Sequence, residues 1–295
     1  MESDDLPLMK AGSMVIAQIT DLHIGFDPGN PDEFNRKRLD EVLTRLTNCP
    51  TPPELLLATG DLTDQGDDDS YARLAEILDA APFPVLPCVG NHDLRATFSR
   101  HFPGFEDDNG FIQYTHDMGA LRLIVVDTLE EGRHGGAFCE ARAAWLKARL
   151  AERRDVPTYI VMHHPPVESG IAWMTTDVRE PWVARFADAI AGANHVQGLI
   201  CGHLHRSLTL QWQGLTVAVC SSSAPQVALD LRLIDVDRPD NRAMIVAEAP
   251  AYALHYWNGE QLVSFFDRAG RQDVLASYDN RMQGLVTQLM GERPA

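Results

Sequence analysis

The stretch that decides the fold is VIAQITDLH at residues 15–23, where an apolar run ends in an aspartate and a histidine. The same arrangement recurs along the chain. Apolar runs at 55–59, 85–89, 158–162 and 196–201 are followed by GD at 60–61, GNHD at 90–93, HH at 163–164 and GHLH at 202–205. Short runs rich in Val, Ile and Leu that end in polar or glycine residues predict buried β-strands. Each of these strands therefore carries polar side chains just beyond its end.

Helical patterns lie between the strands, at residues 33–47, 70–80, 140–153 and 181–191, and a further apolar run lies at 121–126. Strands that alternate with helices predict an α/β sheet covered on both faces. After Cys201 the pattern changes to closely spaced strands at 208–212, 216–220, 231–236, 244–248, 252–256 and 262–266. A helix at about 272–290 is expected to follow them.

The chain is expected to have three parts, namely an N-terminal extension (1–13), one domain (14–268) and a C-terminal helical tail (269–295). The acidic start MESDDLPLMK lacks the apolar segment of a secretory signal. No run approaches the roughly 18 apolar residues of a membrane span. The five cysteines are odd in number and lack CxxC spacing, so we expect free thiols and a reducing cytoplasm.

The net charge of the chain excludes some classes of binding partner. The 295 residues include 25 Lys and Arg against 42 Asp and Glu, which leaves a formal charge of −17. Nucleic-acid polymers and anionic membranes need a basic surface, so neither is expected to bind. A small anionic substrate would need attraction from something other than Lys and Arg.

The polar clusters point to a metal site. The carboxyl ends of strands in an α/β sheet meet at one crevice, so the five clusters can converge there. Asp, His and Asn are ligands suited to Mn, Fe or Zn. Taken alone, a motif of this kind more often marks a turn or a surface histidine than a metal site. Five of them in order, each at a strand end, favour a shared metal site.

Taken in order, DLH, GD, GNHD, HH and GHLH resemble the motifs of the calcineurin-like metallophosphoesterases. The segments GDLTDQG, MHHPPV and AYALHYW resemble, more narrowly, the bacterial class III cyclic-nucleotide and glycerophosphodiester phosphodiesterases. The resemblance runs from about residue 15 to 266. It implies an α/β fold, a four-layer α-β-β-α sandwich of two mixed β-sheets flanked by helices.

The resemblance also implies a set of metal ligands at matching positions. One divalent ion would be held by Asp21, His23, Asp61 and His205, and a second by Asp61, Asn91, His163 and His203. Asp61 would bridge the two ions, which we expect to be Mn or Fe, with Zn as an alternative. His164 is expected to support its neighbour rather than bind metal.

The family mechanism implies attack on phosphorus by a hydroxide that bridges the two ions. His92 would stabilise the transition state or act as general acid. Asp93 would orient the imidazole of His92, or cap the helix that follows it, or do both. Arg206 could contact substrate, but a solvated role is the favoured alternative.

Other side chains receive plainer interpretations. His101, His116, His134 and His195 lie outside the motifs and are expected at the surface or in structural roles, and His255 has no derivable role. Trp173 and Met174 are expected to pack in the core, with a wall of the substrate pocket or a partner surface as the alternatives.

These patterns predict a metal-dependent hydrolase of a small phosphodiester, such as a cyclic nucleotide, a glycerophosphodiester or an aryl diester. The segment Asp64-Gln65-Gly66 has Gln where related protein phosphatases have Arg, which favours a singly charged diester. Pro225 stands where phosphodiesterase relatives often have His, so the substrate stays open. The alternatives are a phosphomonoesterase or nucleotidase at the same site, and a non-catalytic binding module without metals. A homo-oligomer agrees with the resemblance.

Overall fold

The first of two mixed β-sheets contains the strand that opens the sequence. The computed structural model describes residues 9–293, so residues 1–8 of the expected extension lie outside the described residues. The strand order of this sheet is β13-β12-β1-β2-β3. The strands are β1 (Met14–Ile19), β2 (Leu55–Thr59), β3 (Val85–Cys88), β12 (Ala251–Trp257) and β13 (Leu262–Arg268). β1, β2 and β3 are parallel, whereas β12 and β13 are antiparallel to their neighbours.

The second sheet has the order β4-β5-β6-β7-β9-β8. Its strands are β4 (Tyr114–Met118), β5 (Leu121–Val125), β6 (Thr158–Val161), β7 (Val196–Cys201), β8 (Leu208–Trp212) and β9 (Leu215–Val219). The four inner strands are parallel, and β4 and β8 are antiparallel edge strands.

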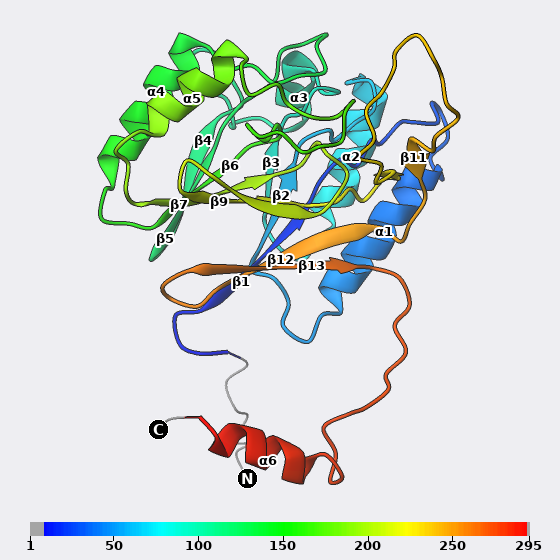
Figure 1. Ribbon diagram of the computed structural model, residues 1–295, viewed down its shortest axis with the longest axis vertical. Coiled ribbons are helices and arrows are strands. Elements are labelled where there is room, and N and C mark those ends of the chain that lie inside the picture. Colours follow the sequence, from blue (N-terminus) through cyan, green and yellow to red (C-terminus); the bar gives the residue numbers. More distant parts are fainter. Residues whose placement is uncertain (1–8, 294–295) are drawn as a thin grey trace.

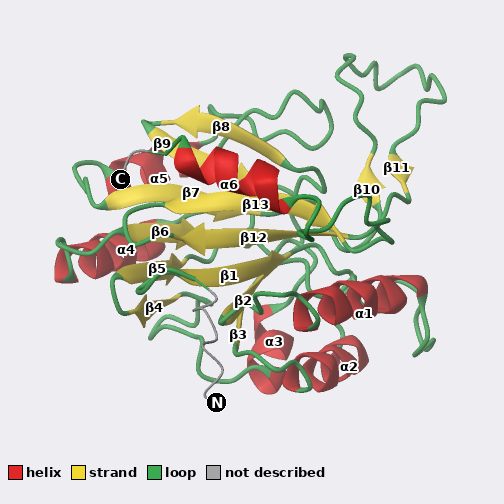
Figure 2. Ribbon diagram, turned by 90° about the horizontal axis from the view of Figure 1, so that it is seen from below, coloured by secondary structure: helices red, strands yellow, loops and turns green. Residues whose placement is uncertain are grey.

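Alternation along the strands builds three apolar layers. In β1, Ile16 packs between the two sheets, whereas Ala17 and Ile19 face the helices, because successive side chains of a strand point to opposite faces. Helices α1 (Phe34–Thr47), α2 (Asp68–Asp79) and α3 (Arg95–His101) cover the first sheet. Helices α4 (Glu140–Glu152) and α5 (Pro181–Ile190) cover the second (Figures 1 and 2). The expected four-layer sandwich is confirmed.

The segment after β9 departs from the prediction. Residues 231–236 do not form the expected strand, and 244–248 contains only the short β11 (Ile245–Val246), which pairs with β10 (Gln226–Val227). The loop between β10 and β11 projects from the body (Figure 2). Leu233 in this loop is 90% exposed, so the apolar alternation that suggested a strand has no sheet to pack against.

The tail also differs from the prediction. The helix expected at 272–290 is replaced by a loop and the shorter α6 (Gln283–Gly291), which is set apart from the sandwich (Figure 1). The Asp279 carboxylate accepts hydrogen bonds from the backbone N–H of Arg281 and Met282, forming a turn ahead of the helix. Within residues 9–293, no helix combines the length and apolar character that a membrane crossing requires.

Candidate metal centre

The predicted ligands lie together at the carboxyl ends of strands from both sheets. Asp21 and His23 follow β1, Asp61 follows β2, and Asn91 follows β3. His163 follows β6, and His203 and His205 follow β7. Because the parallel strands of both sheets end at this edge, side chains up to 184 residues apart meet there.

One group of donors surrounds the end of β1. Oxygen or nitrogen atoms of Asp21, His23, Asp61 and His205 all lie within 4.8 Å of one another. His205 Nε2 lies 3.3 Å from Asp21 Oδ1 and 3.2 Å from His23 Nε2. Two imidazole nitrogens that face each other beside carboxylates are arranged as ligands of a shared cation.

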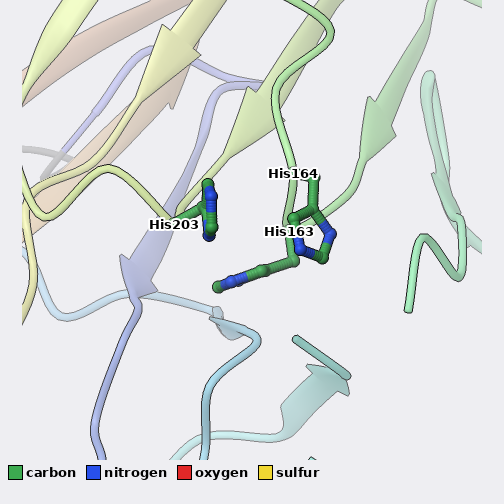
Figure 3. Close-up of side chains that lie close together, drawn as sticks. All are labelled: His163, His164 and His203. Atoms are coloured by element: carbon green, nitrogen blue, oxygen red, sulfur yellow. The ribbon is translucent and has the colours of Figure 1, made fainter. Parts of the chain in front are cut away.

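A second group lies beside the first and shares Asp61 with it. His163 Nε2 is 3.4 Å from Asp61 Oδ2 and 3.3 Å from Asn91 Oδ1. His203 belongs to the cluster of rings in Figure 3, with its centroid 5.1 Å from that of His163. Asp61 Oδ2 is also 3.7 Å from His23 Nε2, so this carboxylate lies between the two groups.

In three of the histidines, the ring nitrogen Nδ1 contacts an oxygen acceptor of the protein. The Nδ1–H of His163 donates to the Thr59 carbonyl, and that of His205 to the Pro225 carbonyl, both at 2.8 Å. His23 Nδ1 lies 3.2 Å from Asp64 Oδ1. Such contacts select the tautomer in which Nε2 is free to bind metal. His164 differs, because Thr128 Oγ1 and the His134 carbonyl engage both of its nitrogens.

Two orphaned atoms support a fit to metal. Asp21 Oδ1 and His203 Nδ1 are buried, and neither has a hydrogen-bond partner among the described residues. Buried polar atoms are nearly always satisfied, so an orphan within a cluster of donors indicates a ligand. With Asp, Asn and His donors in two groups joined by one carboxylate, the cluster fits a dinuclear site.

The backbone beneath the cluster is strained. Positive φ angles are found at Asp21, His23, Asp61, His203 and His205, between 47° and 71°. Non-glycine residues rarely adopt this region, and such strain gathers at functional sites. Gly90 is required for a different reason, because a Cβ there would lie 2.3 Å from Asp61 Oδ1 and 2.7 Å from His163 Nε2.

Mutual electrostatics hold the cluster in a charged state. Burial opposes ionisation of Asp61, but His163 and other histidines outweigh it and hold its pKa well below the ordinary value. Burial also opposes protonation of His163, yet the Asp61 and Asp21 carboxylates raise its pKa to about 9. The pKa of His203 is lowered by burial and by neighbouring histidines.

His92 lies at the rim of the site. Its backbone N–H donates to Asp61 Oδ1 at 2.9 Å, and its ring Nδ1 donates to the Asp64 carbonyl at 2.8 Å. The side chain is 35% exposed and lines the cavity described below. Asp64 therefore positions both His23, through its carboxylate, and His92, through its carbonyl.

The expected orientation of His92 by Asp93 is wrong. The Asp93 carboxylate is buried and accepts hydrogen bonds from the backbone N–H of Gly90, Leu62 and Thr63 and from the Tyr71 hydroxyl, at 2.7–3.2 Å. It does not cap α3 either, whose N-cap residue is Leu94. Asp93 instead joins the loops after β2 and β3.

Replacing Asp93 by Ala is therefore expected to destabilise the fold by about 2–4 kcal/mol, because several buried donors lose their acceptor. Urea unfolding measures this change. Tyr71→Phe, which removes only one of these donors, should cost about 1 kcal/mol. An unchanged urea midpoint in Asp93→Ala, together with a large loss of kcat, would instead favour the original catalytic role.

A cavity of about 420 Å³ opens over the cluster. Its floor includes His23, Asp61, His203 and His205, and its apolar walls are Phe26, Phe34, Trp173, Met174, Val227 and Ile245. Trp173 and Met174 thus pack against the core and form a pocket wall. No Lys or Arg belongs to the lining formed by the described residues.

His134 is a lining residue that the sequence interpretation missed. Its ring centroid is 4.8 Å from that of His203, and its Nδ1 is 3.4 Å from Asn91 Nδ2. No motif surrounds this histidine, so spacing offered no signal. Arg206, in contrast, does not line the cavity, because it donates to the Val227 carbonyl and pairs with Glu248 at 2.7 Å.

Comparison with known proteins agrees with this geometry. A family model described as calcineurin-like phosphoesterase matches residues 14–207. The chain belongs to this family. A protein of Arcobacter nitrofigilis named "Probable glycerophosphodiester phosphodiesterase GpdQ" is 33% identical over 256 residues, covering 84% of this chain and 90% of its own. A Rhodopseudomonas palustris protein named as a probable cyclic nucleotide phosphodiesterase is 31% identical, and the match covers 82% of this chain and 91% of that protein.

Solved structures share the fold at low sequence identity. A dimetal phosphatase from Danio rerio is similar with a TM-score of 0.60 and 14% identity, covering 87% of this chain and 96% of that one. Purple acid phosphatase PPD1 from yellow lupin is similar with a TM-score of 0.63 and 13% identity, covering 90% of this chain and 52% of that one. These likenesses place the sandwich among metallophosphoesterase folds.

Proposed function

We propose that this protein is a binuclear metal-dependent phosphodiesterase that hydrolyses a small phosphodiester. The observation that carries the proposal is the convergence of seven donor residues at the strand ends beneath one cavity, with His92 in the lining of that cavity. Relatives named as phosphodiesterases over most of this chain support the same reaction. A binding module that had lost its metals would lack several of these donors, so we do not favour that alternative.

The two groups of donors support a ligand set for each ion. Asp21, His23, Asp61 and His205 would hold one divalent ion, and Asp61, Asn91, His163 and His203 the other. Mn or Fe suits this mixture of carboxylate, amide and imidazole, and Zn is also compatible. When bound, such ions supply Lewis acidity toward phosphoryl oxygens and lower the pKa of the attacking water.

His92 is proposed as the proton donor to the leaving oxygen. The Asp64 carbonyl holds its Nδ1–H, which leaves Nε2 to face the cavity. In the protonated imidazole, Nε2–H can transfer its proton to an alkoxide as the P–O bond breaks. His134 lies beside Asn91 and His203 in the same lining, where it can bind a phosphoryl oxygen or a sugar hydroxyl.

Charge favours a diester over a monoester. A phosphomonoester carries nearly two negative charges at neutral pH, and sites for it gain from guanidinium groups. The described cavity lining contains no Arg, since Arg206 is engaged by Glu248. Two divalent ions facing the Asp21 and Asp61 carboxylates would leave a small positive charge, sufficient for a singly charged substrate.

The cavity walls favour a substrate with a flat apolar group. Phe26 and Phe34 line the cavity and are 68% and 55% exposed, and Trp173 lies in the same lining. Aromatic side chains bind ring systems by stacking. Cyclic nucleotides and aryl diesters therefore match these walls better than the glycerol group of a glycerophosphodiester, which carries hydroxyl groups and no ring.

Turnover of two aryl esters tests the reaction class. Protein stripped by chelator and reloaded with Mn is given bis(p-nitrophenyl) phosphate or p-nitrophenyl phosphate, and released nitrophenolate is measured. We expect kcat/KM for the diester to exceed that for the monoester by at least about tenfold, because of the missing guanidinium. Faster hydrolysis of the monoester would support a phosphomonoesterase or nucleotidase.

Compartment and assembly are proposed on other observations. All five cysteines are free, which supports the reducing cytoplasm. Exposed apolar side chains on the projecting loop and the tail, such as Leu233 (90%), Val236 (86%) and Leu275 (96%), support a homo-oligomer in which these segments are covered.

A further inference from the structure

A chain of hydrogen-bonded polar side chains crosses the apolar layer between the two sheets. His255 on β12, Gln18 on β1 and Thr59 on β2 are each 0% exposed. Ser264 on β13 lies directly opposite His255 in the antiparallel register. Ile16 and Trp257 pack in the same layer, so these polar groups have little water or other polar surface around them. Buried polar groups of this kind must satisfy one another.

The direction of each hydrogen bond follows from the acceptors. The Cys201 carbonyl can only accept, so the group 2.9 Å from it must be the Gln18 amide nitrogen. The Gln18 amide oxygen then faces His255 Nε2 at 3.1 Å, and this ring nitrogen must carry a proton. Burial lowers the pKa of His255 to about 4, which keeps the ring neutral near pH 7. His255 Nδ1 therefore accepts from the Ser264 hydroxyl at 2.8 Å.

Gln18 connects three strands that carry metal ligands. Its two amide protons reach Thr59 Oγ1 at 2.8 Å in the first sheet and the Cys201 carbonyl in the second. The strand of Gln18 continues to Asp21, that of Thr59 to Asp61 and that of Cys201 to His203. The Thr59 carbonyl also accepts from His163 Nδ1. A shift of the Gln18 amide would therefore move ligands of both groups relative to each other.

We propose that His255 is a positioning residue for the metal centre. By donating to the Gln18 amide oxygen, it holds the amide in the orientation that joins the ligand-bearing ends of β1, β2 and β7. The role is indirect, because no described contact joins His255 to a ligand side chain. This inference rests on the metal centre proposed above.

Manganese binding and its EPR spectrum test the proposal independently of activity. Two adjacent Mn(II) ions give an exchange-coupled spectrum, whereas an isolated ion gives six sharp lines. His255→Leu removes the donor to Gln18 and should weaken binding of the second ion by about 10- to 100-fold, with a growing six-line signal. His255→Gln places an amide N–H close to the position of Nε2 and should restore the coupled spectrum.

A matched control separates positioning from general loss of stability. Leu123→Ala empties space in the same inter-sheet layer, on β5, which carries no proposed ligand. It should lower the melting temperature and leave the coupled spectrum unchanged. Wild-type manganese binding in His255→Leu, or an equal spectral change in Leu123→Ala, would overturn the proposal.

The experiment distinguishes failure of the metal centre from failure of the positioning role alone. If His255→Leu does not fold, His255→Asn replaces it, because its amide nitrogen corresponds to Nδ1 and does not reach Gln18. Should the wild-type protein itself give no coupled spectrum, the metal centre fails, and the positioning role fails with it. A coupled wild-type spectrum that His255→Asn or His255→Leu leaves intact rejects only the positioning role.

Discussion

Replacing Asp61 by Asn is expected to lower kcat/KM for diester hydrolysis by at least about 10³-fold. The Asp61 carboxylate lies 3.4 Å from His163 Nε2 and 3.7 Å from His23 Nε2, so it is the donor shared by both groups. An amide has one oxygen donor and no charge, and cannot serve two cations equally. Metal analysis of the purified variant should find less than one tightly held ion per chain.

The matched control for this variant is Asp40→Asn. Asp40 undergoes the same chemical change on the exposed surface of α1, where its one ion pair within residues 9–293 is with Arg36. It should retain full activity and metal content. If Asp61→Asn binds the same number of ions as the wild type with unchanged affinity, Asp61 is not the bridging ligand.

Replacing His92 by Ala should lower kcat by about 10²- to 10⁴-fold for a diester with an alkoxide leaving group, such as a 3′,5′-cyclic nucleotide. His92 contacts Asp61 through its backbone N–H, which Ala retains, so metal content should stay at the wild-type level. Steady-state kinetics and metal analysis of the same preparation measure both effects.

The control for His92→Ala is a substrate whose leaving group needs no proton. Nitrophenolate is stable without a proton, so bis(p-nitrophenyl) phosphate should suffer a much smaller loss in His92→Ala than the cyclic nucleotide does. Equal losses for the two substrates would show that His92 acts on the phosphoryl group and not as the proton donor.

The edge of the fold that carries the metal site could be predicted from the sequence, because each strand and the polar motif that follows it are adjacent in the chain. The apolar run before Asp21 and the glycine before Asp61 are visible without any tertiary information. Parallel strands then bring their carboxyl ends together by topology. All seven predicted ligands lie at that edge, although their assignment to two ions remains a proposal.

The misassigned residues show where local reasoning stops. Asp93 adjoins His92 in sequence, but the turn starting at Gly90 directs its carboxylate to the backbone of Leu62 and Thr63. His134 lies in a loop with no motif, and tertiary contacts such as those with Asn91 and His203 reveal it. Proximity in sequence does not determine which way a side chain points after a turn.

The elements that the sequence missed or misassigned lie at a sheet edge or outside the two main sheets. Residues 231–236 alternate like a strand, but they pair with no strand of either sheet in the described structure, and Leu233 is almost fully exposed. β4 was not predicted because Tyr114–Met118 includes His116 and Asp117 and lacks an apolar run. Edge strands need fewer buried side chains, so their composition is a weak signal.

The proposed activity requires that this chain bind two metal ions and use them to cleave a phosphodiester. Chelator-stripped protein is titrated with Mn(II) while bound manganese and bis(p-nitrophenyl) phosphate hydrolysis are followed in the same sample. Turnover should be negligible in the stripped protein, and activity should rise with metal occupancy and saturate at two ions per chain. Full hydrolysis without added metal, or saturation of activity at a single bound ion, would contradict it.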